Sequence, residues 1–164
     1  MTSRQQNLPT AAHRGTRPGL TGRATTRVLL VEHDMVFARL LEAWLEERGW
    51  LIRHYSSGRK AIAWVESNPV EVVITALETD DIDGFAVIEQ LGRSCAGVPI
   101  IVCAPHAGLR AWDPSVLLTL GISAALARPI RFHRLEETIR GVLAAQSRQR
   151  NEPESSTFRL DPQP

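Results

Sequence analysis

Five short apolar segments alternate with segments of helical periodicity, and this alternation constrains the fold more than any other feature of the chain. The apolar segments are 28–31, 50–55, 70–76, 98–103 and 122–127. Strict alternation of strands and helices predicts parallel strands joined by right-handed crossovers, with helices on both faces of the sheet. We therefore predict an α/β protein with a single doubly wound, five-stranded parallel sheet between two helical layers.

Residues that favour the ends of helices stand where this pattern needs them. Asp34, Ser57 and Asp83 precede helical segments, and their side-chain oxygens can accept from the free amides of a first helical turn. Asp113 and Pro114 combine a capping residue with a proline at the first helical position. The last helix is predicted over residues 131–145.

The distribution of charge divides the chain into three parts. Residues 1–26 contain four arginines, no acidic residue and no apolar period, which predicts a disordered basic arm. Residues 27–145 contain twelve basic and fifteen acidic residues, and this mildly acidic balance argues against a nucleic-acid-binding domain. Residues 146–164 are polar and contain proline, so we predict a disordered tail with no DNA-binding or catalytic output domain. The arm is a solvated segment or makes a weak electrostatic contact with an acidic partner or nucleic acid.

The composition also bears on location. No apolar run approaches the length of a membrane span. Cys95 and Cys103 fit no CxxC or zinc spacing, which is typical of thiols in a reducing compartment. We therefore expect a cytoplasmic protein.

The residues that end the strands are the candidates for function, because ligands bind outside the carboxyl ends of the strands in open α/β sheets. The segment 70–76 is an apolar, β-branched run, typical of a strand buried on both faces, and it leads into an acidic loop from Glu78 to Asp83. That loop could bind a cation or accept a phosphoryl group. We prefer a solvated turn in which Asp83 and Gly84 set the turn and start the next helix.

Several segments together resemble the receiver domain of two-component response regulators. They are VLLV followed by an acid at 28–32, DGF at 83–85, VPII at 98–101 and GISAALARP at 121–129. The resemblance covers about residues 27–145. It implies the flavodoxin-like strand order 2-1-3-4-5 and a stand-alone, receiver-like module in phosphorelay signal transduction.

The resemblance also implies what each strand end should do. Typical receivers bind magnesium with two acids, phosphorylate an aspartate, and hold the product with a hydroxyl and a lysine. Here the phosphoacceptor position is Ala76, which leaves it vacant, and the hydroxyl position is Ala104. The lysine position is Arg128, and the acidic pair is Glu32 and His33. We expect no cofactor, because an imidazole suits softer metals than magnesium.

These substitutions predict a degenerate pseudo-receiver that acts by phosphorylation-independent protein–protein interaction and is not an enzyme. The alternatives are an unconventional phosphorylatable receiver and a small-molecule-sensing pseudo-receiver. The implied partner is a signalling protein, either a histidine kinase or another regulator, and the sequence leaves open whether the module forms a homodimer. We also expect Glu32 and Arg128 to form an ion pair across the vacant site.

Family receivers meet their partners through the face formed by the fourth helix, the fifth strand and the last helix. Exposed tryptophan and arginine are typical anchors of such a surface. The residues of this chain that the resemblance places there are Leu109, Arg110, Trp112, Arg131 and Arg134.

Overall fold

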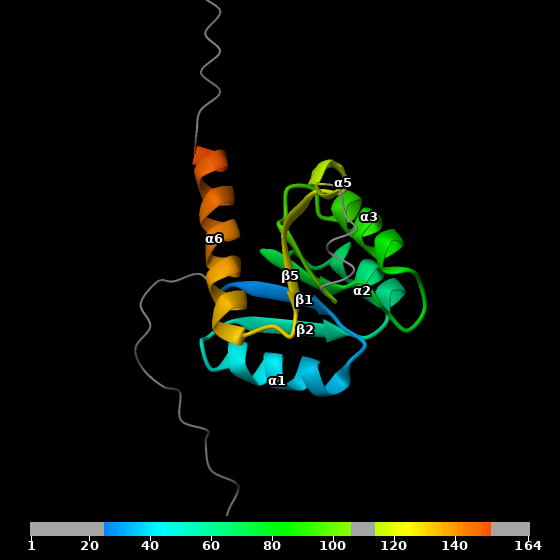
Figure 1. Cartoon of the computed structure of the whole chain (residues 1–164). Coiled ribbons are helices and arrows are strands. Elements are labelled where there is room, and N and C mark those ends of the chain that lie inside the picture. The colour runs from blue at the N-terminus through cyan, green and yellow to red at the C-terminus, as the bar shows by residue number, and fades with distance from the viewer. Residues whose placement is uncertain (1–24, 106–113, 152–164) are drawn as a thin grey trace, which may run out of the picture.

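The sheet has five parallel strands in the order β2-β1-β3-β4-β5, which confirms the predicted fold class (Figure 1). The computed structural model describes residues 25–105 and 114–151. The strands are β1 (Arg27–Val31), β2 (Leu51–Tyr55), β3 (Val72–Ala76), β4 (Ile100–Pro105) and β5 (Ile122–Arg128). Every residue of the central strand β3 is buried, as its apolar sequence predicted.

Helices cover both faces of the sheet, which gives the three layers. The helices are α1 (Met35–Glu46), α2 (Gly58–Val65), α3 (Gly84–Ser94), α5 (Pro114–Thr119) and α6 (Phe132–Asn151). Side chains of α1 and α6 pack on one face, and side chains of α2 and α3 pack on the other. No helix within residues 25–105 and 114–151 combines the length and apolar character that crossing a membrane requires.

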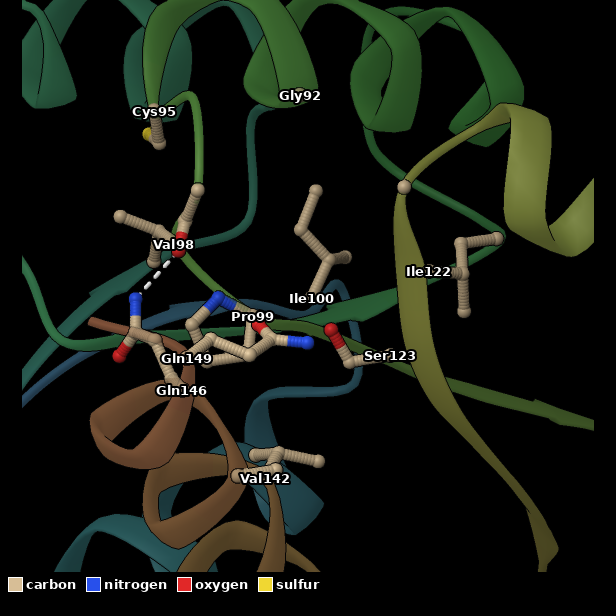
Figure 2. Close-up of a pocket in the computed structure, with 13 residues that line it drawn as sticks. Gly92, Cys95, Val98, Pro99, Ile100, Ile122, Ser123, Val142, Gln146 and Gln149 are labelled. Atoms are coloured by element: carbon tan, nitrogen blue, oxygen red, sulfur yellow. Dashed lines mark hydrogen bonds between the residues drawn. The ribbon is translucent and has the colours of Figure 1, made fainter. Parts of the chain in front are cut away.

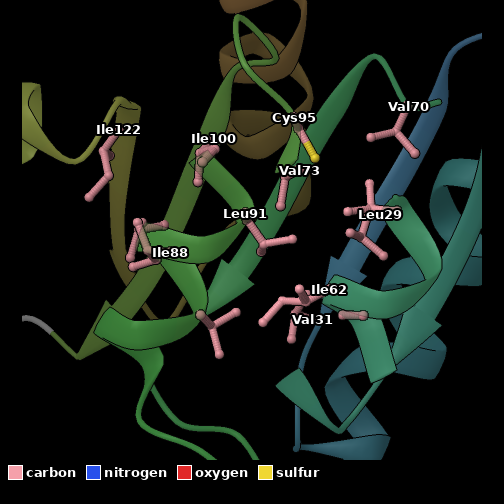
Figure 3. Close-up of a cluster of buried hydrophobic side chains, with 14 of the residues drawn as sticks. Leu29, Val31, Ile62, Val70, Val73, Ile88, Leu91, Cys95, Ile100 and Ile122 are labelled. Atoms are coloured by element: carbon pink, nitrogen blue, oxygen red, sulfur yellow. The ribbon is translucent and has the colours of Figure 1, made fainter. Parts of the chain in front are cut away.

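Two apolar cores result from the alternation of side chains along each strand. Leu29, Val31 and Val73 point to the α2 and α3 side, where they meet Ile62 and Leu91 (Figure 3). Their neighbours along the strands point to the other side and pack against α1 and α6. Because side chains alternate along a strand, burial of both faces favours an apolar residue at every position. Residues 28–31 of β1 meet that condition, and β3 meets it except at Thr75, whose buried hydroxyl donates to the Ala76 carbonyl.

The helix starts are fixed by the residues that the sequence indicated. Asp34 and Asp83 accept hydrogen bonds from two backbone amides each at the starts of α1 and α3, and Ser57 accepts one at the start of α2. Gly84 is required by a close approach, since a Cβ at this position would lie 2.0 Å from the carbonyl oxygen of Leu77.

Several element boundaries differ from the prediction by one or more residues. Helix α6 continues to Asn151, whereas the prediction ended the helix at residue 145 and started a disordered tail at residue 146. The helix extends beyond its apolar period because glutamine and arginine are good helix formers. Strand β4 begins at Ile100, two residues late, because Pro99 has no N–H for the strand ladder. Residues 1–24 and 152–164 lie outside the described part of the chain.

A pair of leucines tests where the core lies. Leu41→Ala should lower the free energy of unfolding by about 2–5 kcal/mol, because Leu41 is fully buried between α1 and the sheet. Leu51→Ala is the control, and its cost should stay below about 1 kcal/mol because Leu51 is 59% exposed. Urea denaturation monitored by circular dichroism measures both. Equal losses would contradict the assignment of the core.

Candidate functional site

The carboxyl ends of the strands carry a buried ion pair between Glu32 and Arg128. Glu32 directly follows β1 and is only 1% exposed, while Arg128 ends β5. An Arg128 Nη2–H donates to Glu32 Oε2, and Glu32 Oε1 accepts from the backbone N–H of Asp34 at 2.9 Å. The ion pair expected from the sequence is therefore present.

The pair crosses two strands of the sheet. Strands β3 and β4 lie between β1 and β5, so the Arg128 side chain has to pass over their ends to reach Glu32. Ala76 and Cys103, which are paired in register on β3 and β4, are small enough to leave room for it. Arg128 also lies over the Phe37 ring, with its Cζ atom 4.7 Å from the ring centroid, which adds a cation–π contact.

A cavity of about 200 Å³ lies beside this pair. Residues at the ends of four strands, β1, β3, β4 and β5, and in the loops after them line it: His33, Asp34, Ala76, Leu77, Glu78, Cys103, Pro105 and Arg128. Ala76 contributes only a methyl group. Burial raises the pKa of the Cys103 thiol to about 12, so this thiol carries its proton at neutral pH.

His33 joins the β1 end to the loop after β3. Its Nδ1 lies 3.1 Å from the Glu78 carbonyl oxygen and 3.4 Å from Glu32 Oε1, and its Nε2 lies 3.5 Å from Glu78 Oε2. The next residue, Asp34, caps α1, and its hydrogen bonds from the Phe37 and Val36 amides lower the pKa of its carboxyl group. The β1 end is thus held by contacts to β3, β5 and α1.

Comparison with known proteins identifies this arrangement. Residues 28–140 match the model of the response regulator receiver domain. The chain belongs to this family. It is a receiver domain of two-component signalling.

The curated relatives are distant and longer. The receiver is 25% identical to the transcriptional regulatory protein ZraR of Salmonella typhimurium over 117 residues, which cover 71% of this chain and 26% of ZraR. It is 24% identical to the regulatory protein VanRc of Enterococcus gallinarum over 114 residues, which cover 70% of this chain and 47% of VanRc. The chain thus spans about a quarter of the length of the first relative and about half of the second.

Solved receiver structures share the fold. A CheY-like receiver domain protein from Methanospirillum hungatei superposes with a TM-score of 0.70 at 20% identity, covering 77% of this chain and 99% of that one. The receiver domain of a sensor histidine kinase from Pseudomonas aeruginosa superposes with a TM-score of 0.64 at 22% identity, covering 74% and 99%. A magnesium ion is coordinated in the active-site cleft of that kinase receiver.

The predicted pocket residues do not all meet at this cavity. Glu32, His33, Ala76 and Arg128 come together there, as the positions of the strand ends suggested. Ala104 does not, because it packs in the core on the α2 and α3 side of the sheet. Cys103, its neighbour on β4, lines the cavity instead, since side chains alternate along a strand.

The acidic loop stabilises two helix starts. Asp83 caps α3, as predicted. Asp81 accepts hydrogen bonds from the Ser57 hydroxyl at 2.6 Å and from the Gly58 and Arg59 amides at 2.8 and 3.4 Å, which ties the loop to the start of α2. The Ser57 hydroxyl and these two amides lower the pKa of Asp81. No local sequence pattern predicts this contact, because its partners lie more than twenty residues away along the chain.

Leu109, Arg110 and Trp112 lie outside the described residues. Arg131 and Arg134 are exposed at the start of α6, and Arg134 forms a 3.5 Å ion pair with Glu137.

A larger cavity, of about 470 Å³, lies at the opposite edge of the sheet, between α3 and the C-terminal half of α6 (Figure 2). Glycines, apolar side chains, Ser123 and two glutamines line it, together with Cys95, whose thiol pKa is raised by burial. Gln146 Nε2 donates to the Gly97 carbonyl there. This lining contains no carboxylate, imidazole or cationic group, so we do not assign the site to it.

The ion pair can be tested by a double-mutant cycle. Arg128→Ala should cost about 3 kcal/mol of unfolding free energy, because it leaves the buried Glu32 carboxylate without its cation. Glu32→Ala and the double variant complete the cycle, and we expect a coupling of about 1–3 kcal/mol from chemical denaturation. The exposed pair Arg134 and Glu137 is the control, with coupling below about 0.5 kcal/mol. Additive losses at Glu32 and Arg128 would contradict a stabilising pair.

The contact of Asp81 with the start of α2 predicts that the stability of the fold depends on pH. Because the folded-state pKa of Asp81 is lowered, its carboxylate stabilises the fold above the ordinary pKa of about 4, and this contribution disappears as the pH falls through the folded-state value. Asp81→Ala should therefore lower the urea midpoint at pH 7, and the difference from wild type should shrink in acid. Asp80→Ala is the control, since only the backbone amide of Asp80 makes a contact to Ser56. A difference that stays constant down to the lowest pH would contradict this role.

Proposed function

We propose that this receiver acts in two-component signalling by protein–protein contact, without phosphorylation of an aspartate. The observation that carries the proposal is the ion pair of Glu32 and Arg128 beside a cavity into which Ala76 presents only a methyl group. A carboxylate oxygen must attack the phosphoryl group in aspartyl phosphorylation, and a methyl group has no lone pair for this step. The family assigns the acceptor role to the position that Ala76 holds here.

The donor atoms at the strand ends do not fit magnesium. Magnesium requires an octahedral shell of oxygen ligands, several of them from water. One oxygen of Glu32 already accepts from Arg128 and the other from the Asp34 amide, while His33 offers a nitrogen and the Ala76 side chain offers no oxygen. The guanidinium of Arg128 supplies a positive charge to Glu32 in place of a metal. We therefore propose a receiver that works without a metal cofactor.

The other two residues at the end of β4, Cys103 and Ala104, support the same proposal. The Cys103 thiol is protonated at neutral pH and hence a weak nucleophile. Ala104 has no hydroxyl to bind a phosphoryl oxygen and faces the opposite core. No nucleophile–base pair is thus found among the described residues of the cavity, and we propose that the module is not an enzyme.

No feature of the site specifically supports the two alternatives, an unconventional phosphorylatable receiver and a small-molecule-sensing pseudo-receiver. Two carboxylates of the acidic loop, Asp81 and Asp83, accept hydrogen bonds at helix starts, which disfavours a substitute phosphoacceptor there. The cavity of about 200 Å³ is smaller than the roughly 300–1,000 Å³ of ordinary small-molecule sites, which disfavours a sensor. The partner we propose is another protein of the signalling pathway, a histidine kinase or a further regulator.

Intact-mass spectrometry tests the proposal. The protein is incubated with acetyl phosphate and magnesium, and we expect its mass to remain unchanged because no carboxylate stands at the end of β3. The positive control is the triple variant Ala76→Asp, His33→Asp, Arg128→Lys, which restores the family's acceptor, acidic pair and lysine, and which should gain the mass of one phosphoryl group.

The result that overturns the proposal is a phosphoryl adduct on the wild-type chain. Peptide mapping would then locate it, and an adduct in the acidic loop would establish the unconventional receiver instead. Thermal shift with nucleotides and common metabolites addresses the sensor: a saturable rise in melting temperature that is lost in Arg128→Ala would favour it.

A further inference from the structure

The cavity of about 470 Å³ at the amino ends of the strands has no part in the proposed function (Figure 2). The C-terminal end of α3, the starts of β4 and β5, and the C-terminal half of α6 border it. Its volume lies within the range of roughly 300–1,000 Å³ that ordinary small-molecule sites occupy. The cavity therefore has the size that a small ligand needs.

A helical glycine keeps part of this cavity open. Gly92 belongs to α3 and lines the cavity, although glycine is among the weakest helix formers. Its φ is not positive, so the backbone conformation does not require a glycine there. A Cβ at this position would meet only the Leu120 carbonyl oxygen, at 3.5 Å, which is an ordinary contact. The fold thus leaves room for a side chain at Gly92, and this room belongs to the cavity.

Three polar side chains that line the cavity have hydrogen-bonding capacity that the fold does not use. Gln146 donates through Nε2 to the Gly97 carbonyl oxygen, which leaves Oε1 free to accept. The Gln149 amide and the Ser123 hydroxyl make no hydrogen bond within residues 25–105 and 114–151. Figure 2 shows both glutamines on α6 and Ser123 on β5. Two carboxamides and a hydroxyl from two elements therefore border one cavity.

The chemistry of the lining defines the class of ligand. Val98, Pro99 and Val142 offer apolar contact surface. No carboxylate, imidazole, ammonium or guanidinium group lines this cavity, so a charged ligand would lose hydration without gaining a counter-ion. A carboxamide presents a donor beside an acceptor, and the complementary edge is that of a heterocyclic base, as in the pairing of glutamine with N6 and N7 of adenine. The lining therefore matches an uncharged heteroaromatic base.

We propose that this cavity binds an uncharged nucleobase or nucleoside of the adenine type. The ring packs on the apolar lining, and its donor–acceptor edge faces the carboxamides of Gln146 and Gln149. A nucleotide gains nothing over the nucleoside, because no cation lines the cavity to pair with a phosphate. The inference goes beyond the proposed function, since this cavity shares no residue with the cavity beside the ion pair.

Isothermal titration calorimetry with adenosine tests the proposal. We expect saturable binding to the wild-type chain, with adenosine monophosphate binding no more tightly than adenosine. Gly92→Leu should raise the Kd for adenosine by roughly tenfold or more, because the new side chain fills the cavity. The control is Ala63→Leu, which adds a leucine at an exposed helical position of α2 away from the cavity and should leave the Kd unchanged.

A second variant separates loss of binding from loss of folding. Gln149→Leu removes a carboxamide at an exposed position that makes no other contact, and it should raise the Kd for adenosine by roughly fivefold to tenfold. Arg128→Ala should leave the Kd unchanged, whereas a sensor at the carboxyl ends of the strands would lose binding.

A wild-type chain that shows no saturable binding of adenosine overturns the proposal. So does binding that Gly92→Leu and Gln149→Leu leave intact, and so does binding that is lost only in Arg128→Ala. None of these results changes the mass expected after incubation with acetyl phosphate, so the two proposals fail separately.

Discussion

The buried carboxylate of Glu32 is the constraint on which the functional end of this domain depends. An ionised group with 1% exposure is costly unless a cation and hydrogen bonds satisfy it. Arg128 supplies the cation from the last strand, 96 residues later in the chain, and the Asp34 amide supplies a hydrogen bond from the loop that leads into α1. The first strand, the last strand and the first helix are therefore fixed to one another through a single side chain.

The substitutions at the strand ends form one consistent set. An arginine is longer than a lysine and donates through a planar fork, so it can reach across β3 and β4 to Glu32. It can do so because Ala76 and Cys103 occupy little space where it passes. An aspartate at position 76 would place a second carboxylate beside the same guanidinium. The alanine and the arginine thus fit each other.

Much of the fold could be predicted from the sequence because its signals are local. The apolar strands, the capping residues Asp34, Ser57 and Asp83, and the alternation of elements each depend on neighbours within a few residues. The ion pair followed from the rule that strand ends meet at one edge. The contact of Asp81 with the start of α2 could not be predicted in this way, since no local pattern links the two segments. The direction of the Ala104 side chain could not be predicted either, because it depends on which residues of β4 face each side of the sheet. The exposure of Leu40 was equally hidden, because it lies in the same helical repeat as the buried Leu41.

The ion pair is also linked to the start of α1. The amide of Asp34 donates to Glu32, and Asp34 in turn caps α1 through the amides of Val36 and Phe37. Phe37 lies under the Arg128 guanidinium and packs edge-on against Phe132 at the start of α6. A receiver that gains and loses a phosphoryl group changes the charge at this point, and with it the forces on α1. Here both charges of the pair belong to the chain itself, and the start of α1 is tied to the strand ends by contacts within the chain.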